Sequence, residues 1–308
     1  MAVPPKFRIG TRGSPLALAQ AYETRGRLMA AHGLGESDFE IVVITTTGDM
    51  VRDRPLAEIG GKGLFTKELE EALLAERIDV AVHSMKDMPG VMPDGLALAA
   101  FLPREDPRDA FISITASSLV NLPQAAVLGS SSVRRTAQAL RLRPDLKTVG
   151  FRGNVETRLR KLGDGVANAT FLACAGLRRL KLQEHITAAM EVAEMLPAPA
   201  QGAIGLQIKQ GQEGAALMLQ PLNHVETEIT VTCERAFMAA LDGSCRTPIA
   251  GHAVLSQGEI WFRGESLTLD GKHAFTAERR GAASDAQRLG QEAAAEVKSK
   301  GGSLIANP

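Results

Sequence analysis

Residues 126–172 read AVLGSSSVRRTAQALRLRPDLKTVGFRGNVETRLRKLGDGVANATFL, in which three short apolar runs alternate with two helical patterns. The apolar runs lie at 126–128, 147–149 and 169–172, and the helical patterns at 133–142 and 155–162. This alternation predicts a mostly parallel sheet with helices on both faces. The pattern also occurs earlier, where apolar runs at 39–44 and 78–82 flank a helical pattern at 64–77. We therefore expect two α/β lobes.

The last third of the chain has a different pattern. Helical patterns at 224–241 and 283–300 enclose three runs typical of strands joined by short turns, at 250–255, 260–266 and 274–280. They predict a C-terminal α+β domain with a small antiparallel sheet. Prolines near 103–107 and 197–199 indicate two crossings between the lobes. The expected domains are a first lobe of 1–103 and 201–221, a second lobe of 104–200, and an α+β domain of 222–308.

The composition limits the possible functions. The 308-residue chain is 44% hydrophobic, has no formal net charge and is only 4% aromatic, which does not favour a nucleic-acid binder. Cys174, Cys233 and Cys245 lack metal-ligand spacing, so neither a metal nor a disulfide framework is expected. The sequence has no apolar signal core and no run long enough to span a bilayer. We expect a cytoplasmic protein that does not bind membranes and, without a long heptad pattern, a monomer.

Basic residues recur where helices are expected to begin, for example before Ser14-Pro15 and after the serines 130–132. Helix N-termini carry partial positive charge, so cations there are unfavourable unless an anion compensates. A carboxylate or phosphate would be held by the free N–H groups and the guanidinium together. The pattern favours a polyanion cleft; the alternative is that each cation is solvated or paired with a nearby acid. The cations concerned are Arg12, Lys62, Arg134, Arg135, Arg152 and Arg158.

Cys245 lies in a segment typical of an exposed, tightly turned loop. Gly243-Ser244 precede it and Arg246 follows it, and a neighbouring guanidinium favours the reactive thiolate. The alternative is a buried free cysteine that acts as a small hydrophobic residue.

Asp87 follows the expected strand at 78–82, at the strand end where open α/β sheets bind ligands. A carboxylate there could stabilise a cationic intermediate and exchange a proton with an amine. The alternative is an ordinary aspartate paired with Lys86. His83 is expected to be a packed or hydrogen-bonded histidine rather than a catalytic one.

Several motifs together resemble the hydroxymethylbilane synthases, also called porphobilinogen deaminases. The resemblance runs from about residue 8 to about residue 251, and its segments are 11–18, 47–49, 60–65, 83–89, 131–135, 152–155, 196–203 and the loop around Cys245. Two positions depart from the family pattern. Ser244 stands where the family usually has a second glycine, and Gln207 stands where it often has an acidic residue.

The resemblance implies two lobes like those of type II periplasmic binding proteins, and a dipyrromethane cofactor attached to Cys245 by a thioether. Four porphobilinogen molecules would be added head to tail to this primer, with loss of ammonia, before hydrolysis releases hydroxymethylbilane. Asp87 would assist loss of the amino group and stabilise the cationic species. Residues implied at the cofactor are Ser84, Lys86, Asp49, Ser132, Arg134, Arg135, Arg158 and Gly153. Residues implied at the substrate are Arg12, Ser14, Gln20, Lys62, Phe65, Arg152, Arg179 and Gln201.

A protein of another class is the alternative: a non-catalytic two-lobe protein that binds an anion or effector. It would explain the basic residues at helix starts. It would not explain a cysteine loop in a third domain, and the sequence lacks the secretion signal or helix-turn-helix that usually accompanies it.

Overall fold

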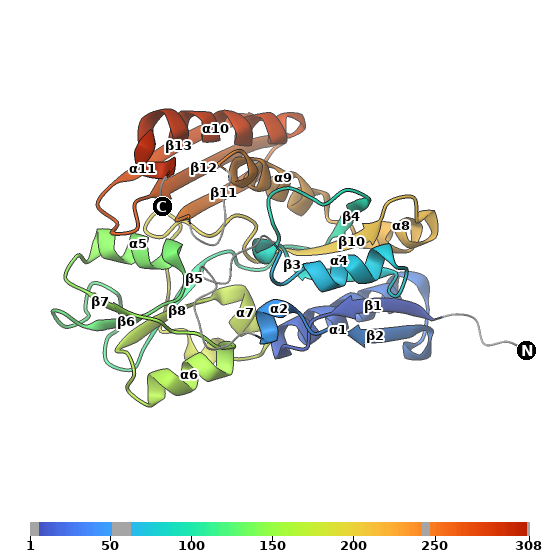
Figure 1. The fold of residues 1–308 in the computed structure, drawn as a ribbon, viewed down its shortest axis with the longest axis horizontal. Coiled ribbons are helices and arrows are strands. Elements are labelled where there is room, and N and C mark those ends of the chain that lie inside the picture. Colours follow the sequence, from blue (N-terminus) through green and yellow to red (C-terminus); the bar gives the residue numbers. More distant parts are fainter. Residues whose placement is uncertain (1–5, 51–62, 242–246, 307–308) are drawn as a thin grey trace, which may run out of the picture. The chain divides into compact units, whose positions relative to one another are not determined.

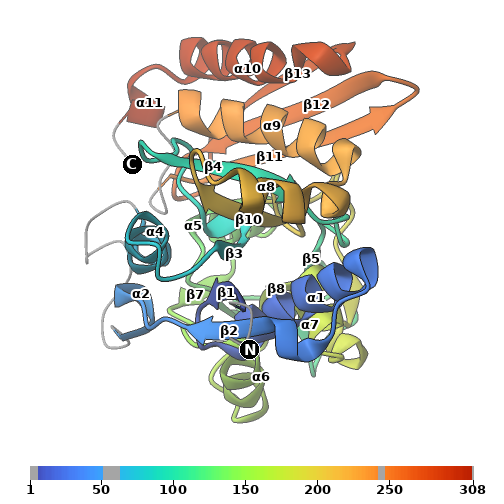
Figure 2. The ribbon, with the colours of Figure 1, turned by 90° about the vertical axis from the view of Figure 1, so that its right-hand side faces the viewer.

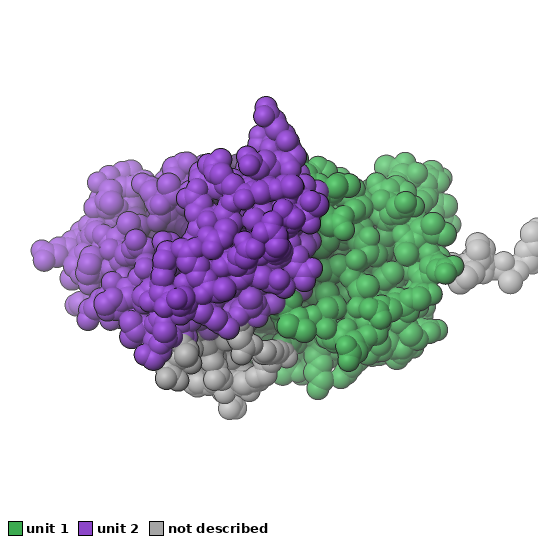
Figure 3. Space-filling model, turned by 90° about the horizontal axis from the view of Figure 1, so that it is seen from above, with its two compact units in different colours: residues 1–51, 61–104, 203–228 green, residues 52–60, 105–202, 229–308 purple. Residues whose placement is uncertain are grey.

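The computed structural model describes residues 6–50, 63–241 and 247–306 of the chain. These residues form two compact units (Figure 3). Unit 1 takes the described residues of 1–51, 61–104 and 203–228, and unit 2 those of 105–202 and 229–308. Unit 1 is built on one sheet and unit 2 on two.

The sheet of unit 1 has five strands in the order β2-β1-β3-β10-β4 (Figure 1). The strands are β1 (Phe7–Thr11), β2 (Phe39–Val43), β3 (Val80–Ser84), β4 (Leu96–Phe101) and β10 (Ile204–Lys209). The helices are α1 (Pro15–His32), α2 (Thr47–Met50), α4 (Lys67–Leu74) and α8 (Glu213–Leu219), with short 3₁₀ turns η1 (Glu36–Asp38), η2 (Met85–Asp87) and η4 (Gln220–Leu222). Strand β10 pairs antiparallel with both neighbours, so four of the five strands run in one direction.

Alternate residues of β3 enter different cores, because successive side chains of a strand point to opposite faces. Val80 and Val82 pack in the core that contains Leu28 of α1. Ala81 packs in the core that contains Leu69 of α4. Helices therefore cover both faces of this sheet, as the alternating pattern predicts. Helix α4 begins at Lys67 rather than at residue 64, because residues 63–66 form a turn before it.

The first sheet of unit 2 repeats this arrangement with the order β7-β6-β8-β5-β9. Its strands are β5 (Asp109–Ser113), β6 (Val127–Gly129), β7 (Lys147–Val149), β8 (Ala169–Ala173) and β9 (Ala188–Ala189). Its helices are α5 (Val133–Leu142), α6 (Val155–Gly163) and α7 (Cys174–Arg179), with the 3₁₀ turn η3 (Gln183–His185). The fourth strand, β5, is again antiparallel to both neighbours. The two expected α/β lobes with mostly parallel strands are confirmed.

The second sheet of unit 2 is antiparallel, in the order β11-β12-β13. Its elements are α9 (Val225–Ala240), β11 (Ile249–Ser256), β12 (Glu259–Leu267), β13 (Ala274–Ala282), η5 (Ala283–Asp285), α10 (Ala286–Gly301) and α11 (Ser303–Ala306). Figure 2 shows α9 and α10 beside this sheet, and Phe237 of α9, Phe262 of β12 and Leu289 of α10 share one core. The expected C-terminal α+β domain is confirmed.

Two segments approach closely where the chain enters and leaves the first sheet of unit 2. Glu105 N donates a hydrogen bond to Gly202 O at 3.3 Å. Gly202 has a φ of 90°, a conformation that favours glycine. A Cβ at this position would lie 2.3 Å from Glu105 O. Gly202 therefore permits both the backbone turn and the close approach.

We expect Gly202→Ala to lower the free energy of unfolding by about 1–3 kcal/mol, because it adds a backbone clash and a strained φ. Equilibrium unfolding in urea measures the change. Gly163→Ala is the matched control, since a Cβ there meets nothing within 4 Å at the end of α6. Equal stabilities of the two variants would show that Gly202 relieves no strain.

Candidate functional site

The expected site residues of unit 1 follow the carboxyl ends of its parallel strands. Strands β2, β1 and β3 are neighbours and run in the same direction, so their carboxyl ends lie along one edge of the sheet. Ligands of open α/β sheets bind at such an edge. The residues there are Asp49 after β2, Arg12 and Ser14 after β1, and Ser84, Lys86 and Asp87 at the end of β3.

Arg12 is held from two sides. Its Nε and Nη2 bind the two carboxylate oxygens of Asp49 at 3.0 and 2.5 Å, and its guanidinium carbon lies 4.2 Å from the centre of the Phe65 ring. Burial opposes the ionisation of Asp49, but hydrogen bonds from Arg12 and Thr46 outweigh it and hold the pKa of this carboxyl below its usual value. Asp49 thus orients Arg12, and these contacts do not use Nη1.

One hydrogen bond caps the N-terminus of α1, and another joins α1 to the end of β3. Ser14 is the N-cap of α1, as expected, and its Oγ accepts from Ala17 N at 3.3 Å. The first turn of α1 contains no acidic residue, so its N–H groups keep their attraction for an anion. Gln20 is buried, and its Nε2 donates to Ser84 Oγ at 2.8 Å. Gln20 and Ser84 are therefore brought together from α1 and β3.

Asp87 is the last residue of η2 and is exposed. Within the described parts of the chain, its carboxylate has neither an ion pair nor a hydrogen bond. The alternative of an aspartate paired with Lys86 is therefore wrong. His83 is buried and hydrogen-bonded to Gln207 at 2.9 Å, which confirms the expectation of a packed histidine.

The expected site residues of unit 2 also follow carboxyl ends of parallel strands, in this case β7, β6 and β8. They are Arg152, Gly153 and Arg158 after β7, Ser132, Arg134 and Arg135 after β6, and Arg179 after β8. Ser132 and Asn154 are the N-caps of α5 and α6, and α5 has no acidic residue in its first turn. The expected helix starts are confirmed at both positions.

Two of these arginines donate hydrogen bonds to backbone carbonyl groups. Arg158 Nε donates to Gly153 O at 2.9 Å, where Gly153 adopts a φ of 125°. Arg179 Nη2 donates to Gly202 O at 3.0 Å. Each bond orients the guanidinium group relative to the carbonyl group that accepts it.

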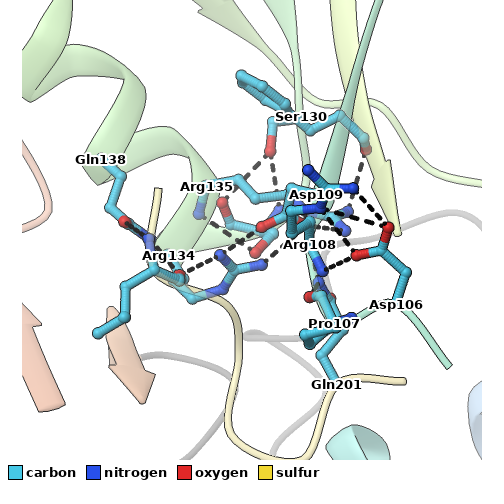
Figure 4. Close-up of polar contacts among 12 residues, drawn as sticks. Asp106, Pro107, Arg108, Asp109, Ser130, Arg134, Arg135, Gln138 and Gln201 are labelled. Carbon is cyan, nitrogen blue, oxygen red and sulfur yellow. Dashed lines mark hydrogen bonds and ion pairs between the residues drawn. The ribbon is translucent and has the colours of Figure 1, made fainter. Parts of the chain in front are cut away.

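Arg134 and Arg135 converge on the buried carboxylate of Asp109 (Figure 4). Arg134 Nη1 lies 2.7 Å from Asp109 Oδ2, and Arg135 Nη2 lies 2.6 Å from Oδ1. The exposed fractions of the two arginines are 5% and 6%, and that of Asp109 is 0%. Gln201 Nε2 completes the cluster, with bonds to Asp109 Oδ1 at 3.2 Å and to Pro107 O at 2.7 Å.

Electrostatics keeps Asp109 ionised although it is fully buried. Burial alone would raise the pKa of this carboxyl, but the two guanidinium groups outweigh it and hold the pKa far below its usual value. Burial also lowers the pKa of Arg135, which Asp109 counteracts. Asp109 was not among the site residues expected from the sequence. The only local sign of it is an acidic residue directly before the apolar run 110–112. Arg12, Arg134 and Arg135 are therefore each paired with an acid, as the alternative to a polyanion cleft expected. Contacts of these three arginines with a ligand stay predictions.

Lys62 and Cys245, with Ser244 beside it, lie outside the described residues. Cys174 and Cys233 are buried free thiols. Burial raises the pKa of Cys174 to about 11 and that of Cys233 to about 12, so both stay protonated at neutral pH. Neither provides a reactive thiolate.

The described residues contain no group of three or more metal-binding side chains. In the same residues, no helix has both the length and the apolar character needed to cross a bilayer.

Two family models match most of the chain. The model of the porphobilinogen deaminase dipyrromethane cofactor binding domain matches residues 7–216, and that of the porphobilinogen deaminase C-terminal domain matches residues 228–299. A porphobilinogen deaminase of Paracoccus denitrificans (strain Pd 1222) is 57% identical over 294 residues, which cover 96% of this chain and 94% of the relative. These matches define a cofactor-dependent enzyme of porphyrin biosynthesis. The chain belongs to the porphobilinogen deaminase family.

Solved structures of low sequence identity are also similar. A putative methionine-binding lipoprotein from Bacillus subtilis subsp. subtilis str. 168 is 13% identical with a TM-score of 0.41, over 71% of this chain and 90% of that chain. A periplasmic substrate-binding protein of an ABC transporter from Coxiella burnetii is 14% identical with a TM-score of 0.42, over 70% and 91% of the two chains. Family membership, rather than these structures, favours the enzyme over the non-catalytic binding protein.

We expect Asp109→Asn to lower the free energy of unfolding by about 3–5 kcal/mol, because it leaves two buried guanidinium groups without their counter-ion. Guanidinium chloride unfolding measures this. Asp145→Asn is the control, because Asp145 pairs with Arg143 nearer the surface, and we expect a much smaller loss. In the wild type, the contribution of Asp109 is present above the ordinary carboxyl pKa and is lost only as the pH falls through its depressed value. Similar losses in both variants would contradict this role of Asp109.

Proposed function

We propose that the chain adds four porphobilinogen molecules head to tail to a dipyrromethane primer joined to Cys245 by a thioether. Ammonia is released at each addition, and hydrolysis then releases hydroxymethylbilane. The observation that carries this proposal is the exposed carboxylate of Asp87, which follows β3. Arg12, oriented by Asp49, and the N-terminus of α1 follow the neighbouring parallel strand β1 at the same edge of the sheet. A lone carboxylate among anion-binding groups fits a reaction in which acidic substrates pass through a cationic state.

The side chains present fit a cofactor that bears carboxylates. In unit 1, Arg12 is oriented by Asp49 without using Nη1, and α1 presents N–H groups behind Ser14. In unit 2, α5 presents N–H groups behind Ser132. Helix N–H groups and guanidinium forks are the groups that bind carboxylates. When bound, the dipyrromethane supplies the pyrrole carbon from which the chain is extended.

We assign the other expected site residues to carboxylates of either the cofactor or the substrate. Lys86, Ser84, Arg158 and Gly153 would hold cofactor carboxylates. Arg152, Arg179, Lys62, Gln20 and Gln201 would hold those of the substrate, with Phe65 against a pyrrole ring. For Arg134 and Arg135, the proposed contact uses the N–H groups that are bound neither to Asp109 nor to the carbonyl oxygens of Leu196 and Phe171.

Asp87 has two tasks in this proposal. In its protonated form, the carboxyl group donates a proton to the departing amino group. The carboxylate that remains stabilises positive charge on the substrate by its own negative charge. The bond between Gln20 and Ser84 fixes the end of β3 from which η2 carries Asp87. The neighbouring arginines bind acidic side arms and leave this carboxylate available for chemistry.

The remaining expectations are part of the same proposal. We place the enzyme in the cytoplasm as a monomer whose partner is the small-molecule substrate, with neither nucleic acid nor a membrane bound. Its proposed domains are the lobe of 1–103 and 201–221, the lobe of 104–200 and the α+β domain of 222–308. The neutral net charge does not favour nucleic-acid binding, and the absence of a long heptad pattern supports a monomer.

We expect Cys245→Ser to give a folded protein without covalent cofactor and without turnover, because only a thiolate forms the thioether. Intact-mass spectrometry measures the adduct, and Cys174→Ser is the control that should retain it. A dipyrrole adduct that persists in Cys245→Ser, or full turnover of that variant, would remove Cys245 from the proposal.

We expect Asp87→Ala to keep the covalent cofactor but to lose turnover by at least about 100-fold, the usual contribution of a general acid–base group. Steady-state release of product measures turnover, and the mass of the intact protein reports the cofactor. Asp94→Ala is the control, because Asp94 is an exposed aspartate of the same unit outside the proposed site. Equal rates of the two variants would exclude a catalytic role for Asp87.

A further inference from the structure

Three buried polar side chains form a chain of hydrogen bonds on the sheet face that α4 covers. His83 comes from β3, Gln207 from β10 and Glu70 from α4, and their exposed fractions are 4%, 0% and 8%. His83 Nε2 lies 2.9 Å from Gln207 Oε1, and Gln207 Nε2 lies 3.5 Å from Glu70 Oε1. Gln207 therefore links β3, the strand that leads to Asp87, to α4, the helix that packs on this sheet.

The contacts of Gln207 determine the orientation of its amide. Its Nε2 donates to Glu70 Oε1 and to Met92 Sδ, so its Oε1 is the end that faces His83. An amide oxygen only accepts, so His83 must donate from Nε2. This assigns the proton of His83 to Nε2.

The same region holds the turn that carries Asp87. His83 pairs with Gly205 of β10 and Ser84 pairs with Ile204, and the ladder continues as Met85 N donates to Ala203 O at 3.1 Å. A Cβ on Gly205 would lie 2.1 Å from Met85 Sδ, so the space beside His83 is filled. A shift of His83 would therefore be transmitted to the residues of η2.

The side chain of Gln207 is uncharged, and this matters for the hydrogen bonds between His83, Gln207 and Glu70. A carboxylate at this position would lie beside Glu70, and two buried carboxylates at such a distance do not both ionise at low cost. Burial already raises the pKa of Glu70, against the hydrogen bond from Gln207. The amide instead donates to Glu70 and accepts from His83, which satisfies both neighbours without a second charge.

We propose that Gln207 is a positioning residue: through His83 it holds the end of β3 and the turn that presents Asp87, and it fixes His83 in the Nε2–H tautomer. The effect on turnover rests on the proposed role of Asp87. The tautomer of His83 does not depend on that role, so the two proposals can fail separately.

The test compares Gln207→Met, Gln207→Glu and the wild type as holoenzymes. Gln207→Met removes the hydrogen bonds to His83, Glu70 and Met92 at similar side-chain volume. We expect it to lower kcat about tenfold or more, as displacement of a catalytic group does, with KM changed less than about twofold. Gln207→Glu keeps an oxygen that accepts from His83. Because the new carboxyl group and Glu70 would share one proton, only one charge is buried, and the variant should restore most of the lost kcat. Gln210→Met and Gln210→Glu are the controls, because Gln210 is exposed just beyond β10, and both should match the wild type.

Nitrogen-15 NMR of the histidine rings gives a second readout, with the His83 signal assigned from its loss in His83→Asn. We expect the Nε2–H tautomer in the wild type and a smaller share of this tautomer in Gln207→Met. Wild-type kcat in Gln207→Met, or an Nδ1–H tautomer in the wild type, would overturn the proposal. If the NMR result is as expected while Asp87→Ala keeps its turnover, the tautomer assignment stands and the role of Asp87 fails.

Discussion

The buried carboxylate of Asp109 organises the first sheet of unit 2. It lies at the start of β5 and binds two successive arginines of α5 together with Gln201. Arg134 also donates to Leu196 O, so the cluster ties the segment near 196–201 to the same helix. Charges taken out of water are tolerated only where partners and hydrogen bonds compensate them. The position of α5, and with it the N–H groups behind Ser132, depends on this compensation.

Both lobes place polar groups at the same edge of a similar sheet and hold arginines there with an acidic residue. In each sheet three neighbouring parallel strands end at one edge, and a reversed fourth strand begins there. Arg12 with Asp49 in unit 1, and Arg134 and Arg135 with Asp109 in unit 2, are guanidinium groups held by an internal acid. An arginine held in this way loses little further conformational entropy when a carboxylate binds. These guanidinium groups are thus already oriented before a ligand binds.

Features that depend on residues close together in the chain, such as helix caps, could be predicted from the sequence. Ser14 and Ser132 were identifiable as N-caps because capping involves a side chain and a backbone group three residues apart. The cluster at Asp109 was missed because its partners lie 25 to 92 residues away in the chain, and no local pattern relates them. The link from His83 to Gln207 spans 124 residues and was missed for the same reason. The motif around Asp87 was identifiable, but the contacts that hold it were not.

The reversed strand β10 has a consequence for synthesis of the chain. It lies between β3 and β4, although more than 100 residues separate it from them in sequence. The N-terminal lobe therefore cannot close its sheet while it emerges from the ribosome, and β3 and β4 lack their common neighbour until residue 209 has been made. Residues 105–202, in contrast, contain every strand of their own first sheet. Because long-range pairing is slow, the middle of this polypeptide can mature before its beginning.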